Sequence, residues 1–336
     1  MVTKSGNLTQ QGYMKPFLAK KDWHQTFYQN VIIDCAVRDR NIIYFGVKEK
    51  IPPEKASLMF DHEIPSKIIA VYLDEPDGSN WSCQKLSGMN LPLIGVSRSP
   101  FSRPSGLIAA RNDDGDVWPM GNGDGPMEHI ANGQRPFANR LKCINSYTYA
   151  VCSGRRIYKR IQVAKWEPFA ELPKVPEHLH MGFNDLDAFS ESDMYAVGGC
   201  GDIWHFDGKN WKQLGFPSNA QLSTVTCAPD GNVYVSGEGG SLWVGRGDTW
   251  KRIYEGSSPV LWNDAFWFDG KLWLASDYQL RLWDGSELKV VEENGKPVSA
   301  YGHMDAYDGL LVVAGPEFVY GFDGKTWKLI VAPYLD

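Results

Sequence analysis

A short motif returns at near-constant spacing along most of this 336-residue chain. It is an Asp-Gly turn followed by a bulky apolar residue, as in Asp207–Trp211 (DGKNW) and Asp323–Trp327 (DGKTW), and some copies are degenerate. Successive copies are 38 to 46 residues apart, with the apolar residue at Trp81, Met127, Trp166, Trp211, Trp250, Leu288 and Trp327. A period of about 40–45 residues is typical of the four-stranded blades of a β-propeller.

Each unit divides into four short runs that are typical of β-strands and are separated by turn residues. In the fourth unit the runs are DLDAFSES, DMYAVGG, DIWHF and NWKQL, and the last three units divide in the same way. The first three units are looser and span Val31–Leu86, Leu91–Ile130 and Phe137–Leu172. We therefore predict an all-β fold, a single seven-bladed β-propeller of four-stranded antiparallel blades over residues 31–336. Residues 1–30 are predicted to form an extension that closes the ring or packs across one face, and helix is expected only there or near 51–65.

The repeats resemble those of a known class of propeller. The segments YAVGGCGDIWHFDGKNW (195–211) and YVSGEGGSLWVGRGDTW (234–250) are similar to the BNR-like, or Asp-box-related, repeats of bacterial propellers, a style also found in photosystem-assembly propellers. A full Asp box reads Ser-x-Asp-x-Gly-x-x-Trp, whereas the motif here is one residue shorter and lacks the serine. The resemblance implies a propeller and leaves the activity open.

The tryptophans of the motif are expected to share one structural task. A motif present in every blade serves a need that every blade has, and that need is structural. We expect Asp to cap the turn, Gly to adopt the turn's backbone angle and Trp to pack between neighbouring blades. Equivalent, largely buried positions on outer strands are therefore predicted for Trp81, Trp166, Trp211, Trp250 and Trp327.

Composition limits the classes of partner and compartment. A formal net charge of −6 argues against a nucleic-acid backbone as the main partner. The six cysteines include no CxxC pair and are expected to be free thiols. The N-terminal stretch lacks the apolar region of a secretion signal, and no apolar run reaches about 18–20 residues. We expect a cytoplasmic protein that does not enter a membrane.

The motifs of common active sites are absent from the sequence. HExxH, GxSxG and GxxxxGK[ST] do not occur, and the Gly-rich runs GGCG and GEGG lie between expected strands without a following helix. We predict no catalytic residue, no metal and no cofactor. A glycoside-hydrolysing propeller remains an alternative, because paired carboxylates can come from different blades, although the Arg-Ile-Pro start motif of sialidases is missing.

One set of polar residues recurs on the expected inner strands. The pattern Asp-Ala-aromatic, with Asp34 at the matching place of the first unit, predicts carboxylates at one height around the central channel, with His303 beside them: Asp34, Asp187, Asp264 and Asp305. Either these carboxylates accept hydrogen bonds that join blade to blade, or they bind a cation or a Lys or Arg side chain.

The segments that depart from the repeat are the expected binding surfaces, because loops carry function more often than strands do. They are Glu49–Pro65, Ser97–Gly106, Arg111–Gly125 and Glu171–Asp185, with Phe101, Trp118 and Phe183 as candidate aromatic anchors. The features together favour a non-catalytic propeller that binds another protein, for which a basic partner would suit the acidic chain. An immunity-type or adaptor protein is the specific version. The alternatives are a carbohydrate-binding or hydrolysing propeller and an assembly factor.

Overall fold

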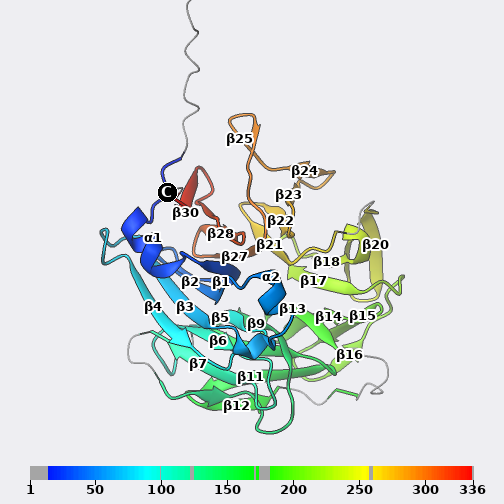
Figure 1. The fold of residues 1–336 in the computed structure, drawn as a ribbon. Helices are drawn as coiled ribbons and strands as arrows, with labels where there is room; N and C mark the ends of the chain where they lie inside the picture. The colour runs from blue at the N-terminus through cyan, green and yellow to red at the C-terminus, as the bar shows by residue number, and fades with distance from the viewer. Residues whose placement is uncertain are drawn as a thin grey trace, which may run out of the picture.

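The chain forms seven four-stranded antiparallel sheets, each built from four strands that are consecutive in sequence. The structure is a computed structural model and describes residues 14–98, 100–121, 125–169, 172–173, 182–256 and 260–334. The innermost strands contact one another in a closed cycle, so the sheets are the blades of a ring (Figure 1). The predicted all-β, seven-bladed propeller is therefore confirmed.

The strand bounds of the looser blades agree with the predicted units. Blade 1 consists of β1 (Asn30–Asp39), β2 (Ile42–Glu49), β3 (Ser66–Tyr72) and β4 (Trp81–Leu86). Blade 2 consists of β5 (Leu93–Ser97), β6 (Ser105–Ala109), β7 (Asp116–Met120) and β8 (Glu128–His129). Blade 3 consists of β9 (Ala138–Ile144), β10 (Tyr147–Cys152), β11 (Arg156–Gln162) and β12 (Lys165–Pro168).

The regular blades follow in the same order. Blade 4 has β13 (Phe183–Ser190), β14 (Asp193–Gly198), β15 (Asp202–Phe206) and β16 (Trp211–Gln213). Blade 5 has β17 (Leu222–Cys227), β18 (Val233–Gly237), β19 (Leu242–Arg246) and β20 (Thr249–Tyr254). Blade 6 has β21 (Asp264–Phe268), β22 (Lys271–Ala275), β23 (Leu280–Trp283) and β24 (Leu288–Val290). Blade 7 has β27 (His303–Tyr307), β28 (Leu310–Ala314), β29 (Val319–Phe322) and β30 (Trp327–Val331).

The remaining elements are short and lie outside the blades. The helices α1 (Lys20–Thr26) and α2 (Pro53–Ala56) fall in the two regions where helix was expected, and α2 is followed by a 3₁₀ turn, η1 (Asp61–Glu63). A second 3₁₀ turn, η3 (Glu238–Gly240), links β18 to β19, and a hairpin, β25 (Glu292–Glu293) and β26 (Lys296–Pro297), links blades 6 and 7. No helix in the described part of the chain is long and apolar enough to cross a membrane.

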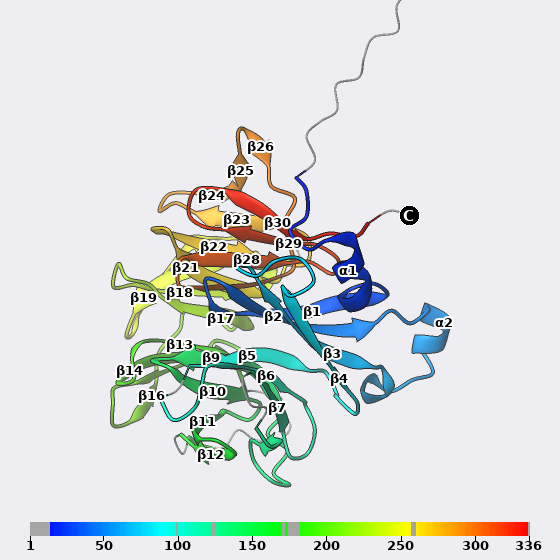
Figure 2. The ribbon, with the colours of Figure 1, turned by 90° about the vertical axis from the view of Figure 1, so that its left-hand side faces the viewer.

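The two faces of the ring differ in what they carry. We call the side on which each innermost strand begins the start face. Because the strands of a blade are antiparallel and consecutive, the start face carries the links from second to third strands and from blade to blade. It also carries α1 and the α2 insertion, which lie on one side of the ring in Figure 2. The opposite face carries the Asp-Gly turns.

The core is divided into seven layers, one between each pair of neighbouring blades. The layer between blades 6 and 7 shows the pattern, because it packs Trp273 and Ala275 of blade 6 against Leu311, Val313 and Trp327 of blade 7. Each of the other six clusters of buried residues likewise joins two adjacent blades. Inter-blade burial of apolar surface therefore holds the ring together.

The Asp-Gly turns have the predicted structural role. In the turn before Trp327, the carboxylate of Asp323 accepts the backbone N–H groups of Lys325 and Thr326 at 2.9 and 2.8 Å, and Gly324 has φ +89°. These hydrogen bonds lower the pKa of Asp323. All five predicted tryptophans lie at the beginning of fourth strands. Only Trp166 and Trp327 are buried, whereas the other three are partly exposed because their strands form the rim of the ring.

A buried ion pair joins the outer strands of blades 2 and 3. Arg160 of β11 donates to both carboxylate oxygens of Glu128 of β8, at 2.8 and 2.5 Å. The indole N–H of Trp166 donates to the same carboxylate at 2.8 Å, and Arg160 also donates to Ser97 at 2.9 Å. Both charged residues are almost completely buried, with exposed fractions of 2% and 1%. A buried pair of this kind is tolerated only because its polar atoms are satisfied together.

The N-terminal segment contacts both ends of the ring. The N–H groups of Phe17 and Leu18 donate to carbonyls of β30 at 2.8 and 3.0 Å, so the segment extends blade 7 at its outer edge. The carboxylate of Asp22 in α1 accepts the indole N–H of Trp81 in blade 1 at 3.1 Å. Residues 1–13 of the predicted extension lie outside the described residues. A ring-closing role for residues 1–30 stays a prediction, which these contacts support.

All six cysteines are free thiols. Cys143 and Cys152 lie on the paired strands β9 and β10, but the register places Cys143 opposite Thr148 and Cys152 opposite Ala138. Burial raises the pKa of the Cys152 thiol to about 12, which keeps it protonated and unreactive at neutral pH.

Candidate functional site

The innermost strands surround a polar central channel. Its cavity has a volume of about 260 Å³ and is lined from six blades, by residues of β1, β5, β9, β21 and β27 and by Asp187 of β13. Four carboxylates predicted from the sequence are in the lining, Asp34, Asp187, Asp264 and Asp305, together with His303. The structure also places cationic side chains there that the sequence did not predict: Arg98, Arg140 and Lys142. The channel is therefore a site of mixed charge rather than an acidic ring.

The predicted carboxylates do not lie at one height. Asp34 and Asp264 each pair with the fifth residue of the second strand of their blade, Gly46 and Ala275. Asp187 and Asp305 each pair with the third residue of that strand. The expectation of a single level is wrong, because the Asp-Ala-aromatic patterns are offset by two residues between blades. A shift of two residues leaves a side chain on the same face of the strand, so the pattern alone could not reveal it.

The true counterpart of Asp264 in blade 4 is Asp185, which pairs with the fifth residue of β14, Val197. Two carboxylates of that strand, Asp185 and Asp187, therefore point the same way at two levels. The sequence pattern predicts Asp187 as a site residue and marks Asp185 only as an adjacent polar position.

Every one of these carboxylates accepts a backbone N–H from the next blade. Asp34 accepts the N–H of Ile94 at 2.9 Å, and Asp305 accepts that of Val37 at 2.7 Å. The same contact recurs three more times, where the N–H groups of Val225, Cys227 and Met304 donate to Asp185, Asp187 and Asp264, respectively. The second oxygen of Asp34, Asp185 and Asp305 accepts the N–H of the following residue of its own strand. The carboxylates thus join blade to blade, as in the first predicted reading, and two of them also pair with a cationic side chain, as in the second.

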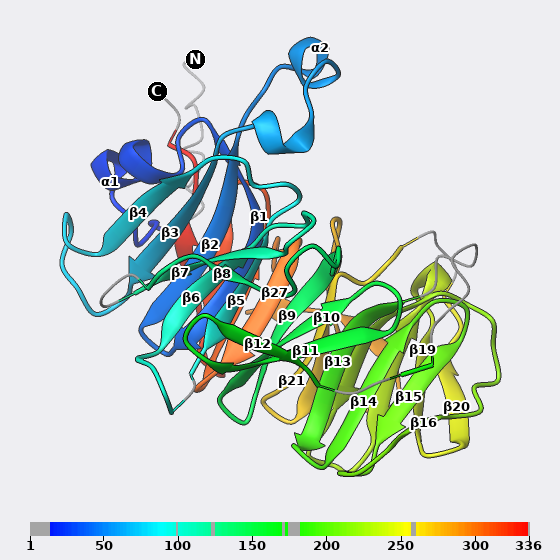
Figure 3. The same ribbon diagram turned by 90° about the horizontal axis from the view of Figure 1, so that it is seen from below.

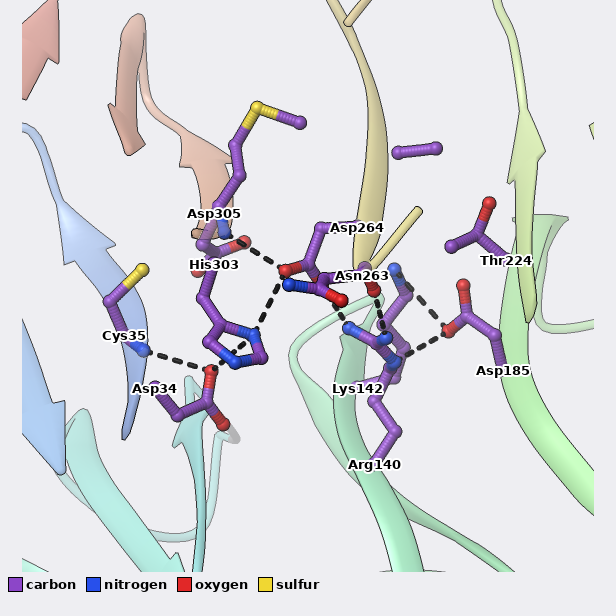
Figure 4. Close-up of polar contacts among 12 residues, drawn as sticks. Asp34, Cys35, Arg140, Lys142, Asp185, Thr224, Asn263, Asp264, His303 and Asp305 are labelled. Atoms are coloured by element: carbon purple, nitrogen blue, oxygen red, sulfur yellow. Dashed lines mark hydrogen bonds and ion pairs between the residues drawn. The ribbon is translucent and has the colours of Figure 1, made fainter. Parts of the chain in front are cut away.

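Arg140 connects three blades across the channel (Figure 4). From β9 in blade 3 its guanidinium donates to the carboxylate of Asp264 and, at 2.6 Å, to the carbonyl of Asn263, both in blade 6. Its Nε lies 3.2 Å from the carboxylate of Asp185 in blade 4. Burial would raise the pKa of Asp264, but Arg140 and His303 outweigh it and hold that pKa well below the ordinary value. The chain therefore supplies its own arginine for the carboxylates.

The two other cations of the channel also act between blades. The ammonium of Lys142 lies 3.7 Å from the carboxylate of Asp185 and 4.4 Å from the ring centre of Phe266 in blade 6. The guanidinium of Arg98 in the blade 2 loop lies 3.5 Å from the ring centre of Tyr307 in blade 7. Such cation–π contacts add to the electrostatic links across the channel.

His303 lies between the carboxylates of Asp264 and Asp34, with Nδ1 at 3.2 and 3.9 Å from them. Burial lowers the pKa of the imidazole, but the hydrogen bond to Asp264 and the charge of Asp34 outweigh it and raise that pKa to about 9. The ring is therefore cationic at neutral pH. Burial is also the largest influence on Asp34, and it raises the pKa of that carboxyl despite the charge of His303.

A fall in stability on alkaline titration should follow from this environment. The pKa of His303 is higher in the folded chain than in the unfolded chain, so protonation of the ring stabilises the fold. This stabilisation is complete below about pH 6.5 and is lost as the pH rises through about 9. Because 37% of the side chain is exposed, we expect water to screen the effect to about 1–2 kcal/mol. Urea unfolding at pH 6.5 and 9.5 should show this fall in the wild type and not in His303→Asn. The exposed His62 provides the control, because His62→Asn should retain the fall. Equal pH dependence in the wild type and His303→Asn would contradict the assignment.

The predicted aromatic anchors have three different environments. Phe183 is fully buried at the beginning of β13, so its predicted role as an exposed anchor is wrong, because the strand begins earlier than the irregular sequence indicated. Trp118 lies within β7 and packs partly buried against the core between blades 1 and 2. Phe101 lies in a turn, partly exposed, 5.2 Å from the guanidinium of Arg160. The binding roles of Phe101 and Trp118 stay predictions.

Outside the channel, one group in the described part of the chain has metal-ligand chemistry. The ligand atoms of Asp114, Asp116 and His129 lie within 4.8 Å of one another. His129 Nδ1 is 2.7 Å from the carboxylate of Asp116, and the amide of Asn112 donates to that carboxylate at 2.7 Å. These mutual contacts account for the closeness of the groups, and we assign no metal to them.

The positions of Arg140 and Lys142 can be recognised in the sequence once two units are compared. The third unit has Arg140 and Lys142 two residues apart on its inner strand, and therefore on one face of it. In the fourth unit Asp185 and Asp187 have the same spacing. Aligning the inner strands of these two units would have placed the two cations beside the two carboxylates of the next blade.

Comparison with known proteins gives one relative by sequence and several by fold. No protein-family model matches the chain. The immune protein Tsi7 of Pseudomonas aeruginosa is 30% identical over 267 residues, which cover 77% of this chain and 87% of that protein. The structure of YCF48 bound to a D1 peptide aligns with a TM-score of 0.56 at 14% identity, covering 91% of this chain and 93% of that one. The WD40 propeller domain of Doa1 aligns with a TM-score of 0.59 at 11% identity, covering 85% and 90%.

Proposed function

Because the chain belongs to the family of the immune protein Tsi7, we propose that it is an immunity protein that binds a partner protein and blocks the partner's harmful activity. The observation that carries the proposal is the 30% identity over 87% of the length of that relative. The propeller fold suits the role, since it presents two broad faces built from loops on a rigid ring. The solved propellers are too distant in sequence to support more than the fold.

We propose that the protein acts by binding and not by catalysis. The channel carboxylates support this, because backbone N–H groups from the neighbouring blade bind every one of them. A glycoside hydrolase needs one carboxyl group that gives up a proton and a second that attacks or activates water, both open to substrate. Carboxylates that are bound by backbone N–H groups in this way hold structure instead.

The experiment has two steps. The tagged chain is used to capture proteins from a native lysate of the cells that produce it, and the captured protein is identified by mass spectrometry. That protein is then expressed in a test bacterium with and without this chain. We expect expression alone to stop growth and co-expression to restore it. Growth that is unaffected in both cases, or arrested in both, would contradict an immunity function.

The class of the repeats and the location of the protein in the cell are also proposals. We propose that the repeats are related to BNR-like repeats, which the Asp-capped turn before the fourth strand supports. A cytoplasmic location stays a prediction from the sequence, and cell fractionation with an antibody against the chain would test it.

A further inference from the structure

The insertion Glu49–Pro65, which runs from the last residue of β2 to the beginning of β3, is a fixed structure on the start face, although it departs from the blade pattern. Its anchor is Asp61, whose carboxylate pairs with the buried ammonium of Lys48 and accepts the N–H of Leu91. Lys48 also donates to the carbonyl of Asp61 at 3.0 Å. The carboxylate of Glu63 accepts the N–H of Phe60 at 2.7 Å and so closes the turn. These contacts hold the insertion in one shape, clear of the sheets (Figure 3).

This fixed insertion exposes two large apolar side chains. Leu58 is 85% exposed and Phe60 is 72% exposed, and the phenyl ring of Phe60 stacks on His62 at 5.7 Å between ring centres. The side chain of Leu91 is half exposed, and its backbone N–H donates to the same carboxylate of Asp61. Packing within the chain does not explain this arrangement, because an apolar side chain in water contributes nothing to the fold. Exposed apolar groups on a rigid support are typical of a binding hot spot.

The distribution of such groups over the molecule also singles out this face. Among the described residues, the three most exposed large apolar side chains are Leu58, Tyr278 and Phe60. Tyr278 lies in the link from β22 to β23, so all three are on the start face. On the opposite face, which carries the Asp-Gly turns, the described large apolar side chains are exposed to smaller fractions.

We propose that the Glu49–Pro65 insertion is the element that binds the partner protein, with Leu58 and Phe60 entering an apolar pocket that has basic side chains around its rim. The proposal rests on the proposed function and adds the surface to it. Because the insertion is already ordered, little conformational entropy is lost when it binds.

The charge of the insertion specifies the rim of the pocket. Three carboxylates of the insertion have no cationic partner among the described residues, namely Glu49, Glu54 and Glu63. Lys50 is paired with Glu317, which leaves Lys55 as the counter-charge within the insertion. An excess of negative charge around an apolar centre is complementary to a basic rim on the partner.

The test uses the captured partner, purified, and measures its dissociation constant by calorimetry. Leu58→Ser/Phe60→Ser should weaken binding at least about 100-fold, because truncating central hot-spot residues has effects of this size. The matched control is Val163→Ser/Val290→Ser, which also removes two exposed apolar side chains, but from the opposite face and an outer strand. We expect the control to change the constant less than about 3-fold, as near-neutral surface positions do. Unchanged thermal unfolding of both variants would show that the fold is intact.

A second variant tests the charge. Glu49→Lys/Glu54→Lys should weaken binding about 10-fold at low salt and less at high salt, because screening removes the difference. Unchanged or tighter binding would overturn the basic rim.

A loss below about 10-fold for Leu58→Ser/Phe60→Ser would overturn the role of the insertion while the immunity function stands. If the wild type were a dimer and Leu58→Ser/Phe60→Ser were a monomer, the surface would bind a second copy of the chain. That result would also overturn the proposal. Failure of the wild type to capture any protein would remove the proposed function itself.

Discussion

Replacement of Arg140 by alanine should lower the free energy of unfolding by about 3–5 kcal/mol, because it removes the main cation of two buried carboxylates and leaves them only Lys142 and His303 as cationic neighbours among the described residues. The side chains of Asp185 and Asp264 are only 2% exposed, and both face this one guanidinium. The variant also removes the contact that links blades 3, 4 and 6 across the channel. Urea unfolding followed by tryptophan fluorescence would measure the loss.

The control for this prediction is an arginine at the surface. Arg135 pairs with Asp113 at 3.2 Å, and both side chains are about two-thirds exposed, so Arg135→Ala should cost less than about 1 kcal/mol. Arg140→Met/Asp264→Asn should be more stable than Arg140→Ala, because it removes one buried charge together with its partner. A cost for Arg140→Ala no greater than that of Arg135→Ala would show that the channel contact is not structural.

The second large effect is expected at the outer strands of blades 2 and 3. Glu128→Ala should also cost about 3–5 kcal/mol, because it leaves the guanidinium of Arg160 buried without a counter-charge and the indole N–H of Trp166 without an acceptor. Chemical denaturation at pH 7 would measure it.

Glu167 offers the matched control, because it pairs with Lys165 in the same blade but is half exposed. Glu167→Ala should change the stability by less than about 1 kcal/mol. Glu128→Ala/Arg160→Met should recover part of the loss of Glu128→Ala, since the unpaired charge is then absent. If the double variant were the less stable of the two, the loss would come from packing rather than from the ion pair.

The blade architecture could be predicted from the sequence because its signals are local. An Asp-Gly turn with its tryptophan lies within five residues, and alternation within a strand shows which side chains share a face. The seven units and their approximate bounds follow from such patterns. Phe183 shows the limit of this reasoning, since the irregular sequence before it hid the beginning of β13.

The arrangement of the channel could not be predicted because it depends on distant segments. The contact of Arg140 with Asp264 joins residues 124 positions apart, from blades that are not neighbours. The height of each carboxylate depends on strand register, which a shift of two residues changes without changing the face. The insertion could be located from its sequence, but which of its side chains meet solvent follows from the Asp61 anchor.

The position of the chain ends has a mechanical consequence. Six of the seven contacts between neighbouring blades are also spanned by the polypeptide, whereas blade 7 meets blade 1 without a covalent link or a shared strand. The segment around Phe17 and Leu18 fastens that seam from outside, and Tyr334 donates to the carbonyl of Leu18 at 2.8 Å. Pulling on the N-terminus therefore loads the seam first, and the circle would open into a chain of blades there before any single blade unravels.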